Sequence, residues 1–203
     1  GNIKTKDNVI RREFRVKEGE LFDGSKLKRS KQRINNLNFF EDVKVDTHRG
    51  QDPDLIDILT TVTEKPTGSF TIGAGFSSVE NLIFSTSIAQ NNLFGGGQRL
   101  NLTAKLSSIR TDFNLSYTEP RVFDSDISFG VDAFNQDQDL ISFDAQSTGG
   151  GFRLGKNVTE YDSVNLKYRF DNVETSGVSA ADETEFFKNG TRVTSRIAPT
   201  YVH

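Results

Sequence analysis

Two kinds of sequence meet at Lys65-Pro66-Thr67-Gly68, which runs directly into Ser69-Phe70-Thr71-Ile72-Gly73-Ala74-Gly75-Phe76. Before this junction the chain is rich in charge and carries helical patterns. After it, apolar residues recur at every second position, beginning with Phe70 and Ile72. A period of two is typical of β-strands whose two faces differ in polarity. The junction therefore predicts a boundary between two domains, residues 1–66 and residues 67–203.

The alternation continues through the rest of the chain. Its apolar positions are Leu82, Phe84, Thr86 and Ile88; Leu100, Leu102, Ala104 and Leu106; Phe113, Leu115 and Tyr117; Ile127, Phe129, Val131 and Ala133; Val164, Leu166, Tyr168 and Phe170; and Val193, Ile197 and Tyr201. With a weaker strand near 151–155, this predicts about eight antiparallel strands, each near the roughly ten residues that cross a tilted membrane barrel. A soluble β-sandwich alternates in the same way and stays open as an alternative.

The connections between these strands differ at the two ends of the predicted sheet. The longest and most polar ones, residues 135–145 and 173–190, fall at one end with 77–81 and 108–111. Aromatic residues gather at the other end, as amphipathic rings do at a membrane interface. The predicted interface aromatics are Phe94, Tyr117, Phe123, Tyr161 and Tyr201.

Composition argues against several classes of function. The 203 residues include no cysteine and two histidines, so disulfides, thiolate nucleophiles and cysteine metal sites are excluded. No run reaches the 18 or so apolar residues of a membrane-spanning helix. Residues 150–157 nearly match a phosphate-binding loop but lack its final Ser or Thr, and a strand follows where that motif needs a helix. We therefore predict no catalytic site, no metal and no cofactor.

The amino-terminal module is predicted to contain two helices followed by two strands. Thr5 or Asp7 is the expected cap of a short helix that runs through Glu13, and Gly24-Ser25 is expected to supply a break and a cap for a second helix that reaches about Asn36. Strands are predicted at residues 43–45 and 56–62, with a turn between them.

Charge is distributed unevenly within this module, although the net charge of the chain is only −3. Residues 1–33 hold eleven Lys or Arg against five Asp or Glu, whereas residues 34–65 hold three against seven. The basic helix has no aromatic platform or nucleic-acid motif, so nucleic acid is not a predicted partner. A solvated helix face and a surface for an acidic protein or a lipid both remain open.

Several motifs, in order and spacing, resemble one known family. In the module they are Gly1-Asn2, Thr5, Asp7, Val9-Ile10-Arg11-Arg12-Glu13, Glu18-Gly19, Arg33-Ile34-Asn35-Asn36-Leu37-Asn38-Phe39-Phe40, Val43 and Glu64-Lys65-Pro66-Thr67-Gly68. Beyond it they are Gly73-Ala74-Gly75-Phe76, Gln90-Asn91-Asn92-Leu93-Phe94-Gly95-Gly96-Gly97 and Thr118-Glu119-Pro120-Arg121. This pattern is similar to the last POTRA domain and first barrel strands of the BamA family of outer-membrane protein assembly factors.

The resemblance implies a fold class: an α+β POTRA-like module followed by an antiparallel transmembrane β-barrel portion. A POTRA domain is a βααββ unit, so we expect its first strand to be missing from this chain. Barrels of the family have about sixteen strands, so residues 67–203 are expected to be the amino-terminal half of one. The implied location is the bacterial outer membrane, with residues 1–66 in the periplasm.

The resemblance also implies a function and its partners. The family folds and inserts β-barrel proteins without nucleotide hydrolysis, and its first barrel strand is a gate that pairs with substrate. The matching gate residues are Ser69, Phe70, Thr71, Ile72, Gly73, Ala74, Gly75 and Phe76. Implied partners are unfolded outer-membrane proteins, outer-membrane lipid and accessory lipoproteins of the BAM complex such as BamD.

The lipoprotein contact is expected at Arg11, Arg12 and Gln32, although the two arginines can instead bond within the module. The neutral Gln32 stands where the family usually has an acid, so an identical ion pair is not expected. Two alternative functions remain: a two-partner secretion or TamA-type translocation pore, and a soluble β-rich binding module.

Overall fold

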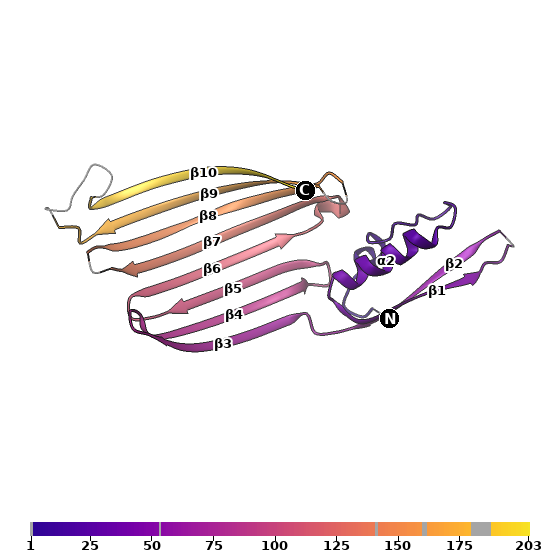
Figure 1. Ribbon diagram of the computed structural model, residues 1–203, viewed down its shortest axis with the longest axis horizontal. Helices are drawn as coiled ribbons and strands as arrows, with labels where there is room; N and C mark the ends of the chain where they lie inside the picture. Colours follow the sequence, from indigo (N-terminus) through magenta and orange to yellow (C-terminus); the bar gives the residue numbers. More distant parts are fainter. Residues whose placement is uncertain (1, 53, 141, 160–161, 180–187) are drawn as a thin grey trace. The chain divides into compact units, whose positions relative to one another are not determined.

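The computed structural model describes residues 2–52, 54–140, 142–159, 162–179 and 188–203 (Figure 1). These residues divide into two compact units. The first comprises Gly1–Gly68 together with Asn91–Gln98, and the second comprises Ser69–Gln90 together with Arg99–His203. The module therefore includes a short segment from far along the chain, which the sequence did not predict.

The first unit contains two helices and a two-stranded antiparallel sheet, in the predicted order. The helices are α1 (Asp7–Arg11) and α2 (Gly24–Asn36), and the strands are β1 (Phe40–Arg49) and β2 (Ile56–Glu64). Neither helix, nor any other in the described part of the chain, has the length and apolar character needed to span a membrane.

The predicted helix caps were wrong in detail. Lys6 precedes α1 with an extended backbone and no side-chain cap, and Asp23 caps α2 by accepting from the N–H groups of Ser25 and Lys26. Thr5 cannot cap α1 because its hydroxyl is engaged elsewhere, with Asn92 and Glu64. A threonine hydroxyl can cap a helix, but the hydroxyl of Thr5 makes long-range hydrogen bonds instead.

The core of the module forms between the helices and one face of the β1–β2 pair. Its members are Val9, Ile10, Ile34, Phe39, Phe40, Val43 and Val62, with Phe14, Leu37 and Val45 packed against them. Ser30 is fully buried on α2, and its hydroxyl donates to the carbonyl of Lys26 and accepts from the N–H of Arg15. This bond fixes the connection between the helices against α2.

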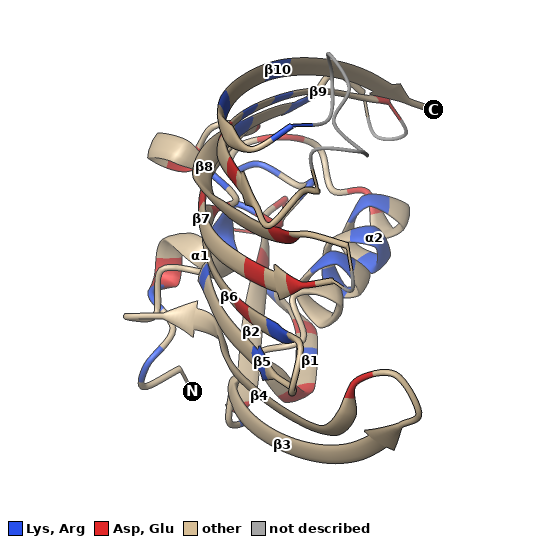
Figure 2. Ribbon diagram, turned by 90° about the vertical axis from the view of Figure 1, so that its left-hand side faces the viewer, with Lys and Arg blue, Asp and Glu red and all other residues tan. Residues whose placement is uncertain are grey.

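The second unit is one sheet of eight antiparallel strands in the order β10-β9-β8-β7-β6-β5-β4-β3. Its strands are β3 (Gly68–Ser77), β4 (Asn81–Leu93), β5 (Gln98–Leu106), β6 (Arg110–Glu119), β7 (Ile127–Asp139), β8 (Asp144–Asn157), β9 (Ser163–Ser176) and β10 (Gly190–Val202), with the short helix η1 (Val122–Asp124) before β7. Figure 2 shows that the sheet is strongly curved. Within the residues that the structure describes the sheet does not close on itself, and β3 and β10 stand at its two ends.

Two predicted loops are shorter in the structure than in the prediction. Strands β7 and β8 stay paired out to Asp139 and Asp144, and β8 and β9 out to Asp144 and Ser176. Much of residues 135–145 and 173–190 is therefore strand. The apolar–polar alternation of the sequence is lost there because both faces of the strands carry polar side chains. The backbone pairing of the strands continues all the same. The near match to a phosphate-binding loop at residues 150–157 lies within β8.

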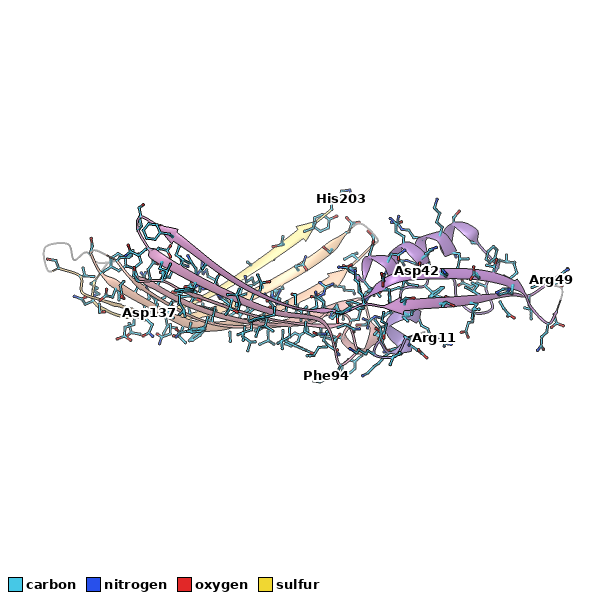
Figure 3. All side chains as sticks on the ribbon, turned by 90° about the horizontal axis from the view of Figure 1, so that it is seen from below. Arg11, Asp42, Arg49, Phe94, Asp137 and His203 are labelled. Carbon is cyan, nitrogen blue, oxygen red and sulfur yellow. The ribbon has the colours of Figure 1, made fainter. Side chains whose placement is uncertain are left out.

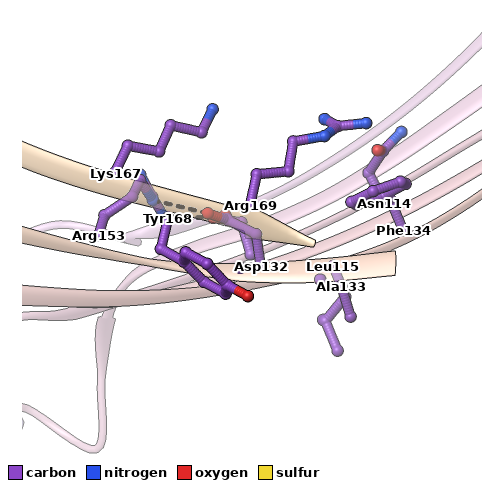
Figure 4. A pocket seen from close by; sticks show the side chains of 12 residues that line it. Asn114, Leu115, Asp132, Ala133, Phe134, Arg153, Lys167, Tyr168 and Arg169 are labelled. Atoms are coloured by element: carbon purple, nitrogen blue, oxygen red, sulfur yellow. Dashed lines mark hydrogen bonds and ion pairs between the residues drawn. The ribbon is translucent and has the colours of Figure 1, made fainter. Parts of the chain in front are cut away.

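The two faces of the sheet differ as the alternation predicted. One face exposes large apolar side chains along most strands, including Phe70, Ile72, Phe84, Ile88, Leu102, Leu115, Val131, Leu154, Leu166 and Ile197. The other face carries ion pairs between Arg110 and Asp112, Arg153 and Asp132, and Arg169 and Asp171. Figure 4 shows Lys167 and Arg169 on one side of β9 and Tyr168 on the other. An apolar face of this extent needs a nonaqueous environment.

We predict that Ile34→Ala destabilises the module by about 3 kcal/mol, because Ile34 is fully buried and the substitution leaves a cavity. The free energy of local unfolding, obtained from native-state hydrogen exchange of α2, measures this change. Lys31→Ala on the exposed side of the same helix is the matched control, with an expected effect within about 0.5 kcal/mol. Equal effects of both substitutions would contradict the core assignment.

Candidate gate strand and module junction

The predicted gate residues, Ser69 to Phe76, all lie in β3, an edge strand of the sheet. Its only neighbour among the described strands is β4. Phe70, Ile72 and Phe76 are 64%, 69% and 79% exposed, which makes β3 among the most exposed apolar strands of the sheet. A lipid-facing strand with one free backbone edge can accept a further strand.

Gly73 and Gly75 lie on the other face of β3, where they reduce its packing. A Cβ atom on Gly73 would lie 2.8 Å from the hydroxyl of Ser85, whereas one on Gly75 would have open space around it. The absence of a side chain at Gly73 therefore leaves room for Ser85, and at Gly75 it leaves open space on this face of the sheet. Few side-chain contacts hold this part of β3, so backbone hydrogen bonds are its main attachment.

The structure separates the three predicted lipoprotein-contact residues. Arg11 is exposed and its nearest acid is Glu18 at 3.8 Å, and Gln32 is exposed on α2. The Arg12 side chain is only 9% exposed and points inward, where its Nη2 lies 2.7 Å from the site of a Cβ on Gly97. Arg11 and Gln32 are therefore accessible to a partner, while Arg12 packs within the module.

The predicted interface aromatics are placed at strand ends or turns, apart from Tyr161, which lies outside the described residues. Phe94 and Phe123 are 85% and 99% exposed, and Phe94 projects outward from its turn (Figure 3). Tyr117 lies near the end of β6, and Tyr201 lies near the end of β10, where its hydroxyl donates to Asp162. The antiparallel order puts the ends of β6 and β10 at the same rim of the sheet.

Glu64 makes long-range contacts that the sequence did not predict. It is the last residue of β2, and its carboxylate accepts hydrogen bonds from the backbone N–H groups of Ile3, Lys4 and Thr5. Partial burial alone would raise its pKa, but these bonds and one from the Thr5 hydroxyl lower the pKa to about 2. Glu64 thus ties the start of the chain to the end of the module, next to the junction at Lys65.

The turn at residues 91–98 is the second feature that was missed. Asn92 is 7% exposed and its amide donates to the hydroxyl of Thr5 at 2.8 Å. The N–H of Lys6 donates to the carbonyl of Gly95, and the N–H of Asn91 donates to the carbonyl of Thr67. The three-glycine run at residues 95–97, quoted above as part of a family motif, is therefore built into the module. The run itself was the only signal in the sequence.

No metal site emerges in the described ranges, where no three or more His, Cys, Asp or Glu side chains are grouped to hold an ion. Several charged side chains of the sheet are paired with one another. Figure 4 shows one such pair, Arg153 with Asp132, whose Nε and Oδ2 atoms lie 2.8 Å apart.

Taken together, a helical module joined to a curved antiparallel sheet with one apolar face defines a class: outer-membrane barrel proteins with a periplasmic domain. The Omp85 superfamily domain matches residues 92–201, and POTRA, described as a surface antigen variable number repeat, matches residues 1–65. The chain belongs to the Omp85 superfamily. As a member with a POTRA domain, it is an outer-membrane protein whose POTRA domain lies in the periplasm.

Individual relatives agree with the predicted resemblance to the BamA family. The outer membrane protein assembly factor BamA of Nitratidesulfovibrio vulgaris is 38% identical over 174 residues, which cover 86% of this chain and 22% of that protein. The chain thus spans about a fifth of the length of this relative. The crystal structure of BamA from Haemophilus ducreyi lacking POTRA domains 1–3 matches with a TM-score of 0.75 at 24% identity, covering 97% of this chain and 41% of that one.

The fold is shared beyond the assembly factors. CdiB from Acinetobacter baumannii matches with a TM-score of 0.58 at 15% identity, covering 85% of this chain and 36% of that one. The predicted fold class, a POTRA module followed by strands of an antiparallel barrel, is confirmed.

We predict that the module loses stability as the pH falls from about 4.5 to about 2, because the pKa of Glu64 is lowered from 4.5 to about 2 on folding. The ionised carboxylate of Glu64 stabilises the module fully above pH 4.5, and this stabilisation is lost below about pH 2. Glu64→Gln should remove this dependence and cost about 1 kcal/mol at pH 7, a modest value since water screens a partly exposed carboxylate.

Hydrogen exchange of residues 3–6 between pH 3 and pH 7, corrected for intrinsic rates, measures this contribution. Glu41→Gln is the control, because Glu41 is exposed at the start of β1. A Glu64→Gln protein that retains the wild-type dependence on pH would contradict the assignment.

Proposed function

We propose that the intact protein folds and inserts β-barrel proteins into the bacterial outer membrane, with β3 as the strand that templates the incoming chain. The observation that carries this proposal is the character of β3, which exposes an apolar face, has open space around Gly75 and has β4 as its only neighbour among the described strands. In lipid an unpaired backbone group costs several kcal/mol, so such an edge binds a complementary strand.

The template needs no chemical step. In the closed state, Ser69 to Phe76 pair with the last strand of the barrel. In the open state, they pair with an unfolded outer-membrane protein, whose hydrogen bonds replace those of closure. Exchange of one ladder for another is close to neutral in free energy, which suits an assembly factor that works without nucleotide hydrolysis. The protein is accordingly not proposed to be an enzyme.

Residues 1–66 are the proposed docking module. The exposed basic surface of α2, blue in Figure 2, and Arg11 suit an acidic partner, and accessory lipoproteins such as BamD are the partners we propose. Outer-membrane lipid is the proposed environment of the apolar face. We propose no nucleic-acid partner.

A two-partner secretion pore is the second candidate, and the fold it shares with CdiB is the observation in its favour. The two candidates differ in what the gate must do. An assembly factor needs the free edge of β3 to open, whereas a secretion pore can keep its wall closed and pass the chain through its interior.

We predict that a disulfide between β3 and its closing strand in the intact protein abolishes client assembly, and that reduction restores it. The readout is the yield of folded client barrels in vesicles containing the oxidised or reduced protein. Thr103→Cys with Asn114→Cys is the matched control, since these residues face each other on β5 and β6, which need not separate.

Unchanged assembly with a closed β3 disulfide would overturn the template. Passage of a secreted client through the same locked protein would favour the secretion pore instead.

We predict that Arg11→Glu reduces copurification of the accessory lipoprotein at least about tenfold, because it reverses charge on an exposed docking surface. Lys44→Glu is the control, since Lys44 is exposed on β1. Arg12→Glu should instead destabilise the module, because its side chain is enclosed. Retention of the lipoprotein by Arg11→Glu would exclude this surface as the docking site.

A further inference from the structure

The turn at residues 91–98 is more deeply enclosed than a solvent-exposed hairpin turn. Asn92 and the glycines 95–97 are buried, whereas Asn91 and Phe94 are exposed. The partners that bury these residues belong to the first unit, in the segments around Thr5, Arg12 and Thr67. The turn is thus an internal part of the POTRA module, although the chain that leads into and out of it belongs to the barrel sheet.

Asn92 is the centre of the polar contacts that hold this turn. Its side-chain carbonyl accepts from the N–H of Gly97 at 2.8 Å, and its side-chain amide donates to the hydroxyl of Thr5 at 2.8 Å; both bonds are buried. The Thr5 hydroxyl in turn bonds to Glu64. A short polar chain therefore runs from the turn to the last residue of β2. Removal of one member leaves a buried polar group without its partner, which is costly.

Close backbone packing requires glycine at two positions of the turn. Gly95 has a φ of +73°, and a Cβ on it would lie 1.8 Å from the carbonyl oxygen of Lys4. Gly97 has a φ of +83°, and a Cβ there would lie 2.7 Å from Nη2 of Arg12. Side chains are excluded at both positions by backbone conformation and by contact. The N–H of Lys6 donates to the carbonyl of Gly95 at 2.9 Å, which completes the fit.

The same turn is connected to the gate strand. The N–H of Asn91 donates to the carbonyl of Thr67 at 3.0 Å, and Thr67 immediately precedes β3. The end of β4 is thereby fixed to the residue from which β3 begins. Any motion that frees the turn also frees one end of the pairing between these two strands.

We propose that residues 91–98 form a latch by which the POTRA module controls the gate strand, and that Thr5 and Asn92 are its positioning residues. When the latch is docked, the ends of β3 and β4 are held and the gate strand is restrained. When the module releases the turn, β3 loses this restraint and its edge opens more readily. The role of the latch rests on the proposed function of β3 as a template strand.

The first test measures the latch directly in the intact protein in membranes. Asn92→Ala should raise the hydrogen-exchange rate of residues 91–98 and of Lys6 by about tenfold, since it removes two buried hydrogen bonds. Asn135→Ala is the matched control, because Asn135 also donates to a threonine hydroxyl at 2.8 Å but at an exposed position of the sheet. Wild-type exchange in Asn92→Ala would overturn the latch.

The second test asks whether Thr5 and Asn92 act through each other. Thr5→Val removes the hydroxyl while keeping the shape of the side chain. If the two residues form one unit, Thr5→Val combined with Asn92→Ala should exchange no more than about twofold faster than the stronger single variant. Thr5→Val combined with Asn135→Ala should give the product of the separate effects. If the exchange rate of the double variant Thr5→Val with Asn92→Ala equals the product of the two single effects, the two residues share no contact and the proposal is contradicted.

The third test asks whether the latch restrains the gate. Exchange in residues 69–77 should rise about fivefold in Asn92→Ala and stay at the wild-type rate in Asn135→Ala. A rise confined to residues 91–98 would overturn control of the gate. Client assembly is measured in parallel with wild-type protein: failure to assemble any client would contradict the proposed function alone, because the exchange experiments decide the latch without it.

Discussion

Backbone hydrogen bonding between neighbouring strands is the constraint on which the rest of this structure depends. In a hydrocarbon environment there is no water to satisfy an N–H or C=O group, so every spanning strand needs a partner on both sides. Among the described strands, the six inner ones, β4 to β9, have two neighbours each. An edge strand in lipid needs a partner strand for the same reason. A protein that opens such an edge gains an affinity for strands without any dedicated binding pocket.

The polar face of the sheet shows how the same ladder accommodates charge. Arg153 lies across Gly130, where a Cβ would stand 2.9 Å from its guanidinium, and from there it donates to Ser116 and Thr118. Arg169 lies 3.9 Å above the ring of Phe134, which itself covers Gly149. Gly130 thus leaves room for the Arg153 guanidinium, and Gly149 leaves room for the ring of Phe134 that Arg169 covers. The charged side chains gather on this face, and large apolar side chains are exposed on the other.

Sequence periodicity predicted the strands, their two faces and the order of elements in the module, because these depend on neighbours two to four residues apart. It failed where a polar side chain or a glycine serves a distant contact. Thr5 reads as a helix cap, but it bonds to Asn92, 87 residues away, and to Glu64. For Arg12 the sequence left surface docking and bonding within the module both open, and the structure places its side chain against Gly97, in the segment Asn91–Gln98 far along the chain. Strand ends near Asp139 and Ser176 were missed because a ladder needs no alternation once both faces are polar.

The proposed gate strand, β3, and the module that precedes it are held by contacts of unequal strength. Along β3, Gly75 leaves open space and Gly73 merely avoids Ser85, so side chains contribute little to its pairing on that face. At its start, buried bonds from Asn92, close packing at Gly95 and the carboxylate of Glu64 converge within a few residues of the junction. A weakly packed strand that is held at one end loses its pairing most easily at the other end. The held end separates only after its own contacts are broken.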